Sequence, residues 1–322
     1  MNITVLLGGP SAEREISLIS GKAVAAALRQ AGHDVFESDI SPTNLIGLDH
    51  PADVIFPVLH GEFGESGELQ EILEQRNLPF VGSGSVASRI GIDKIATKRL
   101  WLNAGLPTPH WEVVSRATAT KNRMPAPCVV KPIANGSSID VFICRTQDQA
   151  TRAYEALLTR YSHIMAESLI DGPELTISIL EEQPLDPIRI VVKREFFDFD
   201  AKYKNCGTEH HFDLNLPESV IDHCRDLARR ANHLVGARDL ARVDLMLDRA
   251  SNPYLLEINT LPGFTPTSLL PEAAAHAGID FPCLVDRLAT RAALRHPESL
   301  TPVVRINANL LNRNRSAKLK SA

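Results

Sequence analysis

The stretch ARVDLMLDRASNPYLLEINTLPGFT, residues 241–265, decides the fold because it contains two strand-like runs joined by a turn. Arg242 and Asp244 alternate with apolar residues in the first run, and Glu257 and Asn259 do so in the second. Successive side chains of a strand point to opposite faces of the sheet, so each polar pair shares one face. The pattern predicts a hairpin that gathers all four side chains if the strands pair with those faces in common.

The chemistry of this hairpin face indicates a metal site. Leu256 and Ile258 supply the opposite, apolar face of the second run, and a turn is expected around Asn252-Pro253. Two carboxylates and an amide offer only oxygen ligands, which suit Mg²⁺ bound together with substrate phosphates. The alternative is a charged sheet face exposed to water. The sequence NTLPG at 259–263, directly after the strand, favours a site.

Length and composition are those of a globular protein with more than one domain. The chain has 322 residues, a formal net charge of −5 and 44% hydrophobic residues, which gives no argument for nucleic acid or an anionic membrane as partner. No segment is long and apolar enough to span a bilayer, and the N-terminus lacks the basic region of a signal peptide. Five scattered cysteines without a C-x-x-C motif indicate reduced thiols. We therefore expect a cytoplasmic protein.

Strands and helices alternate in the N-terminal part, which predicts a parallel sheet with ligand-facing loops at the carboxyl ends of its strands. Glu13, His60 and Glu65 all fall in such loops. Each could be an ordinary loop residue, but three at one edge of a sheet favour a binding site. The segment Gly82–Ala87 loosely resembles a dinucleotide fingerprint. It follows a late strand and lacks the acidic partner, so a nicotinamide dehydrogenase is not favoured.

Two lysines in the next part are candidates for phosphate contact. A helix expected from Ile92 to Ala104 carries Lys94, and we place the first domain boundary near Ile92. Lys131 ends a predicted strand, and small residues at 135–138 follow in a loop that can bring backbone N–H groups close to an anion. Either lysine alone would be an ordinary surface residue. The loop is not a P-loop, because the pattern G-x-x-x-x-G-K-[ST] does not occur in the chain.

The remaining segments surround the hairpin. Residues 164–180 indicate a strand, a turn and a second strand, with Glu167 and Glu174 flanking the turn. Residues 196–214 mix polar and aromatic side chains without a sustained period, which predicts a long loop. Two helices with a break at Gly278 follow the hairpin.

Taken together, these segments resemble the D-alanine–D-alanine ligases of the ATP-grasp superfamily. The matching motifs cover nearly the whole chain up to about Ala293 in the family's order, and they are LLGGPSAEREISLISG, HGEFGESGELQ, GSGSVASRIGIDKIATK, VVKPIANGSS, DGPELTISIL, DFDAKY, ARVDLML and LLEINTLPGFTPTSLLP. The resemblance implies an α/β fold, with an N-terminal Rossmann-like parallel-sheet domain followed by a two-lobed ATP-grasp fold with antiparallel sheets. The units would be 1–92, 93–180 and 181–305, and a basic, disordered tail would occupy 306–322.

The resemblance also implies a reaction and its cofactors. ATP would phosphorylate one D-alanine to D-alanyl phosphate, and a second D-alanine would attack it, giving D-alanyl-D-alanine for peptidoglycan synthesis with release of ADP and phosphate. Two Mg²⁺ ions, replaceable by Mn²⁺, would be held by Asp244, Glu257 and Asn259. The residues implied for the nucleotide are Lys94, Lys131, Lys202, Glu167, Glu174 and the backbone at Leu169 and Ile170. The small-molecule substrates would be the partners, and the family favours a homodimer.

The same resemblance implies roles at the D-alanine end. Glu13 would receive the ammonium of the first D-alanine in a hydrogen-bonded set with Ser137 and Tyr203, and His60 would lie near that substrate. Arg242 and the Gly263 backbone N–H would form the oxyanion pocket. Ser268 would bind the carboxylate of the second D-alanine.

The chain departs from the family pattern at Asp140, where glycine is usual, at Ser66, where aspartate is usual, and at Phe197 and Phe199, where tyrosines are common. An aspartate that faces the nucleotide should weaken ATP binding, whereas one that points outward would be harmless. Asp140 is therefore the one argument for a non-catalytic nucleotide-binding protein. A second alternative is a ligase that makes D-alanyl-D-serine or D-alanyl-D-lactate, although Lys202-Tyr203 matches the dipeptide-forming pattern and argues against lactate.

Overall fold

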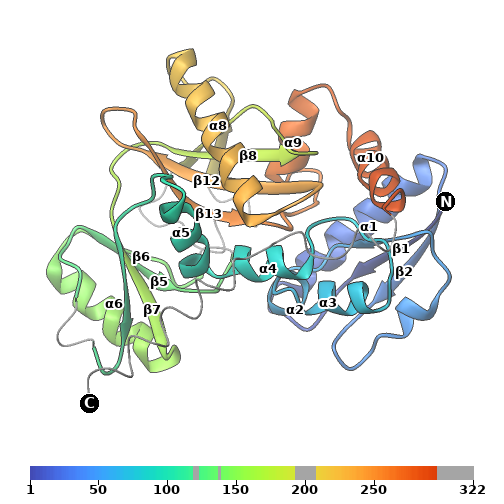
Figure 1. Ribbon diagram of the computed structural model, residues 1–322, viewed down its shortest axis with the longest axis horizontal. Coiled ribbons are helices and arrows are strands. Elements are labelled where there is room, and N and C mark those ends of the chain that lie inside the picture. Colours follow the sequence, from blue (N-terminus) through green and yellow to red (C-terminus); the bar gives the residue numbers. More distant parts are fainter. Residues whose placement is uncertain (119–122, 137–138, 193–207, 296–322) are drawn as a thin grey trace.

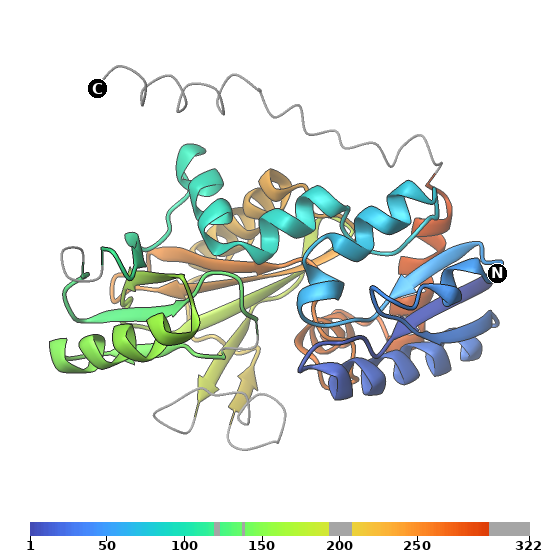
Figure 2. The ribbon, with the colours of Figure 1, turned by 90° about the horizontal axis from the view of Figure 1, so that it is seen from below.

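The computed structural model describes residues 1–118, 123–136, 139–192 and 208–295. Strands in these ranges form three sheets. The N-terminal sheet and a four-stranded sheet lie at opposite ends of the molecule, and a six-stranded sheet lies between them (Figure 1, Figure 2). The first sheet is parallel and the other two are antiparallel, which confirms the expected fold class.

The N-terminal sheet has the strand order β2-β1-β3. Its strands and the short helices around it are β1 (Asn2–Leu7), α1 (Arg14–Gln30), β2 (Asp34–Asp39), the 3-10 helix η1 (Ile46–Asp49), β3 (Val54–Pro57), α2 (Glu62–Glu65) and α3 (Glu68–Gln75). β1 is buried from Ile3 to Leu7, as expected of a parallel strand covered on both faces. Side chains of α1 and of the C-terminal helix α10 (Phe281–Ala293) pack on one face, and those of α2 and α3 pack on the other.

The strand expected before Gly82 is reduced to one parallel bridge between Phe80 and Ile55. The helix expected from Ile92 is also different, because α4 (Ser85–Ile92) ends there and α5 (Lys94–Asn103) is a second helix. Asp93 between them has an extended backbone, and its carboxylate caps α5 by accepting hydrogen bonds from two N–H groups at 2.8 and 3.0 Å. The cap fixes where Lys94, the first residue of α5, is placed.

The four-stranded sheet has the order β4-β7-β5-β6. Its elements are β4 (Trp111–Ser115), β5 (Cys128–Pro132), β6 (Phe142–Cys144), α6 (Gln147–Arg160) and β7 (His163–Ser168). Helix α6 packs on the sheet through Tyr154 and Leu157, which are fully buried. Its start is fixed by a capping box between Thr146 and Gln149.

The six-stranded sheet has the order β11-β10-β8-β12-β13, with β9 paired to β8. Its strands and the helices that follow them are β8 (Glu174–Leu180), β9 (Gln183–Pro184), β10 (Ile188–Val192), β11 (Thr208–His211), α8 (Glu218–Val235), β12 (Leu240–Leu247), β13 (Pro253–Asn259), α9 (Leu269–His276) and α10. Apolar residues of α8 pack against β8 and β12 in one core. No helix of the described residues is long and apolar enough to cross a membrane.

The structure tests two sequence-based interpretations of this region. The strand, turn and strand predicted at 164–180 are confirmed, and the turn connects two sheets because β7 and β8 belong to different ones. The loop predicted over 196–214 is wrong for Thr208–His211, which pair with β10 as β11. Residues 193–207 of that segment, and the tail expected to be disordered, lie outside the described residues.

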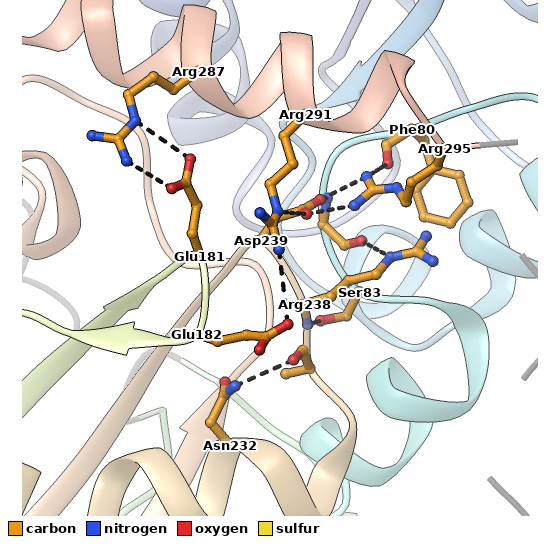
Figure 3. Close-up of polar contacts among 12 residues, drawn as sticks. Phe80, Ser83, Glu181, Glu182, Asn232, Arg238, Asp239, Arg287, Arg291 and Arg295 are labelled. Carbon is orange, nitrogen blue, oxygen red and sulfur yellow. Dashed lines mark hydrogen bonds and ion pairs between the residues drawn. The ribbon is translucent and has the colours of Figure 1, made fainter. Parts of the chain in front are cut away.

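Helix α10 joins the N-terminal sheet to the six-stranded sheet. Its apolar residues share a core with Ile3 and Val5 of β1. On its other side Arg287 binds Glu181 at 2.6 Å, and Arg295, just past the helix, binds the buried Asp239 through both carboxylate oxygens (Figure 3). These contacts place the N-terminal sheet relative to β12, whereas the expected domain boundaries at 92/93 and 180/181 stay predictions.

Asp239 is the centre of this network. Its carboxylate also accepts a hydrogen bond from the Gly82 N–H at 2.8 Å, and Arg291 lies 3.6 Å from it (Figure 3). The neighbouring Arg238 donates to the Gly82 carbonyl at 2.7 Å and lies over the Phe80 ring. One buried carboxylate therefore ties together three segments that are far apart in the sequence.

Removing this carboxylate should destabilise the fold. We expect Asp239→Ala to lower the free energy of unfolding by about 3 kcal/mol, because the change leaves the partly buried Arg295 without its carboxylate partner and the Gly82 N–H without its acceptor. Asp171→Ala is the matched control, since Asp171 pairs with Arg249 on the surface and the change should cost less than about 1 kcal/mol. Urea unfolding followed by circular dichroism measures both values, and equal losses would contradict the assigned role.

Candidate functional site

The predicted common face of the hairpin is present. β12 and β13 are antiparallel, with Arg242 opposite Asn259 and Asp244 opposite Glu257. Directly opposed residues of an antiparallel pair lie on the same face of the sheet. All four side chains line one cavity.

A β-bulge directly follows this face. The register shifts after Asp244, so that Leu245 is opposite Leu255 and Leu256 is the extra residue. The apolar face of β13 is therefore formed by Leu255 and Ile258, which are buried, and Leu256 is half-buried. The simple alternation of Leu256 with Ile258 expected from the sequence is wrong, because it cannot anticipate the bulge.

Arg242 and Asp244 form an ion pair within β12. Nε of Arg242 lies 2.9 Å from Oδ1 of Asp244, and its terminal nitrogen lies 2.8 Å from Oδ2. The Thr176 hydroxyl donates to the same Oδ1 at 2.6 Å. The carboxylate is held in one orientation by three donors, and a carboxylate with about four lone-pair sites keeps acceptor capacity for a cation.

Lys94 connects the hairpin to the small-residue loop. Its Nζ lies 3.2 Å from a carboxylate oxygen of Glu257 and donates to the Asn135 carbonyl at 2.7 Å. The side chain of Lys94 is 8% exposed and that of Glu257 is 29% exposed. A buried ammonium beside a more open carboxylate can reach an anion that enters from the cavity.

A cavity of about 440 Å³ collects residues of the N-terminal loops, of the hairpin and of the α9 N-terminus. The predicted site residues that line it are Glu13, His60, Lys94, Glu174, Arg242, Asp244, Glu257, Asn259, Gly263 and Ser268. A pocket of this size suits small-molecule ligands. Predicted residues from distant parts of the chain thus meet in one place.

His60 and Glu13 form the N-terminal side of the cavity. Both are buried, and His60 Nδ1 lies 3.4 Å from a carboxylate oxygen of Glu65. The His60 backbone is held by Ser17 and Ser11, at 2.9 and 2.6 Å. Its buried Nε2 has no hydrogen-bond partner within the described residues, so it is available to a ligand.

Gly263 and Ser268 form the opposite side. Ser268 is the residue before α9, and its hydroxyl accepts a hydrogen bond from the Thr265 N–H at 3.0 Å. A Cβ at position 263 would lie 2.8 Å from the Ser268 hydroxyl oxygen, so a side chain there would displace that hydroxyl. Gly263 itself lines the cavity.

A buried cluster of charges lies beside the cavity. Glu167 contacts Lys131 through one carboxylate oxygen and Lys98 through the other, the latter at 2.8 Å. Lys98 is fully buried and also donates to the Thr108 hydroxyl at 2.6 Å. Burial alone would raise the pKa of Glu167, but the two lysines outweigh it and hold that pKa below its usual value.

The pKa values of the two lysines in the cluster are shifted in opposite directions. Burial would lower the pKa of Lys131, but the charges of Glu167 and Glu257 outweigh it and raise the pKa. Burial dominates for Lys98 and lowers its pKa to about 8, although Glu167 opposes the shift. The cluster therefore keeps Lys131 charged beside the cavity.

Some predicted residues are placed elsewhere. Lys131, Glu167, Leu169 and Ile170 are not among the residues that line the cavity. Leu169 lies in the connection between β7 and β8, where its N–H donates to the Pro127 carbonyl at 3.3 Å. The remaining three, Ser137, Lys202 and Tyr203, lie outside the described residues.

The sequence interpretation missed three residues of this region. Thr176 shares the cavity-lining face of β8 with Glu174, two residues away, and this spacing was a usable signal. Lys98 is four residues after Lys94 on α5, which places both on one side of the helix. His210 of β11 lines the cavity and lies 2.6 Å from Glu272, and no local pattern indicates it.

Asp140 points away from the cavity, which settles the question that the sequence left open. Its carboxylate binds both terminal nitrogens of Arg160, at 2.7 and 2.9 Å, and accepts from the Tyr161 hydroxyl at 2.7 Å. The charge of Asp140 is therefore paired at the end of α6. It gives no reason to expect weaker nucleotide binding.

The pKa of Lys98 predicts how stability depends on pH. Between about pH 8 and its ordinary value of 10.5, the folded protein binds fewer protons at this site than the unfolded chain does, so stability rises with pH. We expect the free energy of unfolding of the wild type, relative to Lys98→Met, to increase through this window. Urea unfolding at both ends of the window measures it, with exposed Lys22→Met as the control, and a pH-independent difference would contradict the prediction.

Known proteins share this architecture. Two family models match, D-ala D-ala ligase N-terminus over residues 37–83 and D-ala D-ala ligase C-terminus over residues 100–290. The D-alanine–D-alanine ligase of Gloeobacter violaceus is 41% identical over 300 residues, covering 91% of this chain and 99% of that protein. The one from Gluconobacter oxydans is 42% identical over 304 residues, covering 92% and 100%.

Solved structures agree with the sequence relatives. The crystal structure of the Bacillus anthracis D-alanine–D-alanine ligase is 31% identical with a TM-score of 0.81, and the match covers 92% of this chain and 99% of that one. A structure of that ligase complexed with ATP gives a TM-score of 0.78 at 28% identity, with the same coverage. The chain therefore has the ATP-grasp fold and belongs to the D-alanine–D-alanine ligase family.

Proposed function

We propose that this protein joins two D-alanine molecules to D-alanyl-D-alanine at the expense of ATP. The observation that carries the proposal is the single cavity in which Glu13 and His60 of the N-terminal loops face the Arg242, Asp244, Glu257 and Asn259 hairpin. The relatives at 41% and 42% identity are D-alanine–D-alanine ligases over nearly their whole length. We place the activity in the cytoplasm, in peptidoglycan precursor synthesis, and propose a homodimer.

The reaction has two bond-forming steps. A carboxylate oxygen of the first D-alanine attacks the γ-phosphorus of ATP, and ADP leaves. The amino nitrogen of the second D-alanine, after losing a proton, attacks the acyl carbon and forms a tetrahedral oxyanion. The carbon–oxygen bond to phosphate then breaks, which yields the dipeptide and inorganic phosphate. Both steps develop negative charge, so cations and N–H donors placed in advance stabilise their transition states.

The D-alanine end is assigned to both sides of the cavity. Glu13 would bind the ammonium of the first D-alanine together with Ser137 and Tyr203, and the unpartnered Nε2 of His60 supports a substrate contact there. Arg242 and the Gly263 backbone N–H would stabilise the oxyanion. Ser268, whose hydroxyl lies against residue 263, would bind the carboxylate of the second D-alanine. The burial of Glu13 and His60 helps to keep water from the acyl phosphate.

The nucleotide end is assigned to the lysines and glutamates beyond the hairpin. Lys94, Lys131 and Lys202 would contact the phosphates, and the raised pKa of Lys131 supports a permanently charged side chain there. The remaining contacts, to adenine and ribose, would come from Glu167, Glu174 and the backbone at Leu169 and Ile170. The buried pairing of Glu167 with two lysines supports a role in holding the lysines as well.

The hairpin face fits Mg²⁺. Asp244 and Glu257 are opposed across the strands, and Asn259 adds an amide oxygen on the same face. No group of three or more His, Cys, Asp or Glu side chains in the described part of the chain could hold a metal by itself. Mg²⁺ commonly takes further ligands from substrate phosphates. When bound, two Mg²⁺ ions, or Mn²⁺ in their place, would neutralise phosphate charge.

The alternatives have less support. A non-catalytic nucleotide-binding protein was suggested by Asp140 alone, and that carboxylate is paired with Arg160 away from the cavity. A ligase for D-serine or D-lactate as second substrate depends on Lys202 and Tyr203, which lie outside the described residues. The named relatives favour D-alanine in both positions.

The activity itself is directly testable. We expect purified protein with ATP and Mg²⁺ to release phosphate only when D-alanine is added, with one dipeptide formed for each phosphate. D-Serine and D-lactate, each added beside a limiting amount of D-alanine, test the second substrate. Phosphate release that does not respond to D-alanine would refute the proposal.

Arg242 should be the most sensitive basic residue of the hairpin. We expect Arg242→Ala to lower kcat by about 100-fold or more, because the oxyanion loses its charged donor. Arg249→Ala is the matched control, since this arginine also pairs with an aspartate but lies in the exposed turn of the same hairpin. Steady-state kinetics at saturating ATP measures both, and a change in kcat of similar size in both variants would contradict the assignment.

A further inference from the structure

Asp140 has a backbone conformation that most residues avoid. Its φ is +63°, in the left-handed region where glycine is common and where asparagine and aspartate are the best tolerated of the other residues. It lies at the end of the small-residue loop, defined here as residues 135–140, of which 137 and 138 lie outside the described part. The Ile139 N–H donates to the Gly136 carbonyl at 3.2 Å, so the two described parts of the loop are in direct contact.

The carboxylate of Asp140 is a fixed part of a local network. Arg160, the last residue of α6, binds both of its oxygens, and the Tyr161 hydroxyl donates to one of them at 2.7 Å. The side chain of Asp140 is only 15% exposed, whereas that of Arg160 is 52% exposed. Paired, charge-assisted hydrogen bonds of this kind are stronger and more directional than neutral ones.

The network reaches both ends of the loop. The Tyr161 hydroxyl, which donates to Asp140, also accepts from the Asn135 side-chain amide at 2.8 Å. The Asn135 carbonyl in turn accepts from Lys94 Nζ, which lies 3.2 Å from Glu257. One tyrosine oxygen therefore connects the last residue of the loop to its first residue, and through it to the hairpin.

The protonation of Tyr161 suits this arrangement. Its pKa is raised, first by burial and then by the hydrogen bond to Asp140 and the charge of that carboxylate. The hydroxyl therefore keeps its proton and can go on donating to Asp140. Asp140 and Tyr161 support each other, because each fixes the orientation that the other needs.

We propose that Asp140 is a positioning residue of the nucleotide site, which holds Asn135 and Lys94 in place for the ATP phosphates through Arg160 and Tyr161. Gly136 and Asn135 of this loop line the cavity, so their positions bear directly on a bound anion. The inference rests on the proposed function in one respect only, the binding of ATP. The alternative that the test must exclude is an ion pair that adds stability and nothing more.

Three substitutions separate these roles. Asp140→Gly removes the carboxylate and also relieves the left-handed backbone, Tyr161→Phe removes one hydroxyl without touching the loop, and Arg160→Ala removes the charge partner. Arg152→Ala is the matched control, because Arg152 is on the same helix and pairs with Asp148 at an exposed position, 77% and 72% exposed. Melting temperatures of all four variants test whether each is folded.

Calorimetric titration with the non-hydrolysable ATP analogue AMP-PNP and Mg²⁺ is the decisive measurement. We expect Asp140→Gly and Tyr161→Phe each to raise the Kd roughly three- to tenfold, and Arg160→Ala to raise it in the same direction. The KM for ATP should rise in parallel, with the KM for D-alanine unchanged. Arg152→Ala should bind as the wild type does. The double variant of Asp140 and Tyr161 should raise the Kd by less than the product of the two single-variant factors, because the two residues act together.

Other results would overturn the inference. Tighter or unchanged AMP-PNP binding by Asp140→Gly would show that the aspartate is only a tolerated replacement for glycine. A lowered melting temperature with unchanged Kd would show a stabilising role alone. Wild-type protein that binds AMP-PNP but forms no dipeptide would refute the proposed function and leave the role of Asp140 in nucleotide binding to be judged by the titrations.

Discussion

The pairing of Asp244 with Glu257 across β12 and β13 is the constraint on which the site depends. A one-residue slip would send every side chain of one strand to the other face of the sheet. The bulge at Leu256 lets Leu255 and Ile258 both enter the core. The polar pairs lie before the register shift, so they stay opposite each other and line the cavity.

Four carboxylates on or near the hairpin face and the small-residue loop are neutralised before any phosphate arrives. Each of the four lies against a basic side chain, and the pairs are Asp140 with Arg160, Glu167 with Lys98 and Lys131, Asp244 with Arg242, and Glu257 with Lys94. Buried charges are costly unless paired, so the lysines can be kept dry only because the carboxylates are there. When a phosphate enters, a lysine exchanges one anionic partner for another. This exchange requires less desolvation than burying an unpaired lysine would.

Local patterns predicted the parts of the fold that depend on neighbouring residues. The alternation around Asp244 predicted the shared face. The resemblance in motifs and their order predicted that Glu13 and Ser268 lie near it, and all three residues line one cavity. Features set by long-range contacts were not accessible. No residue pattern near Leu256 predicts a bulge. Likewise, the sequence does not indicate that β7 and β8 join different sheets. The direction of Asp140 depends on Arg160, twenty residues away in the sequence.

Strand β12 connects the Asp239 network to the hairpin face of the cavity. Asp239 immediately precedes β12, so the carboxylate that receives Arg295 and the Gly82 N–H is three residues from Arg242 and five from Asp244. Strands transmit such a constraint because their backbone is fixed on both sides by ladder hydrogen bonds, here to β8 and β13. Through α10 the same anchor holds the N-terminal sheet, whose loops carry Glu13 and His60 on one side of the cavity. The distance across the cavity is therefore set at the base of β12, away from the reacting groups.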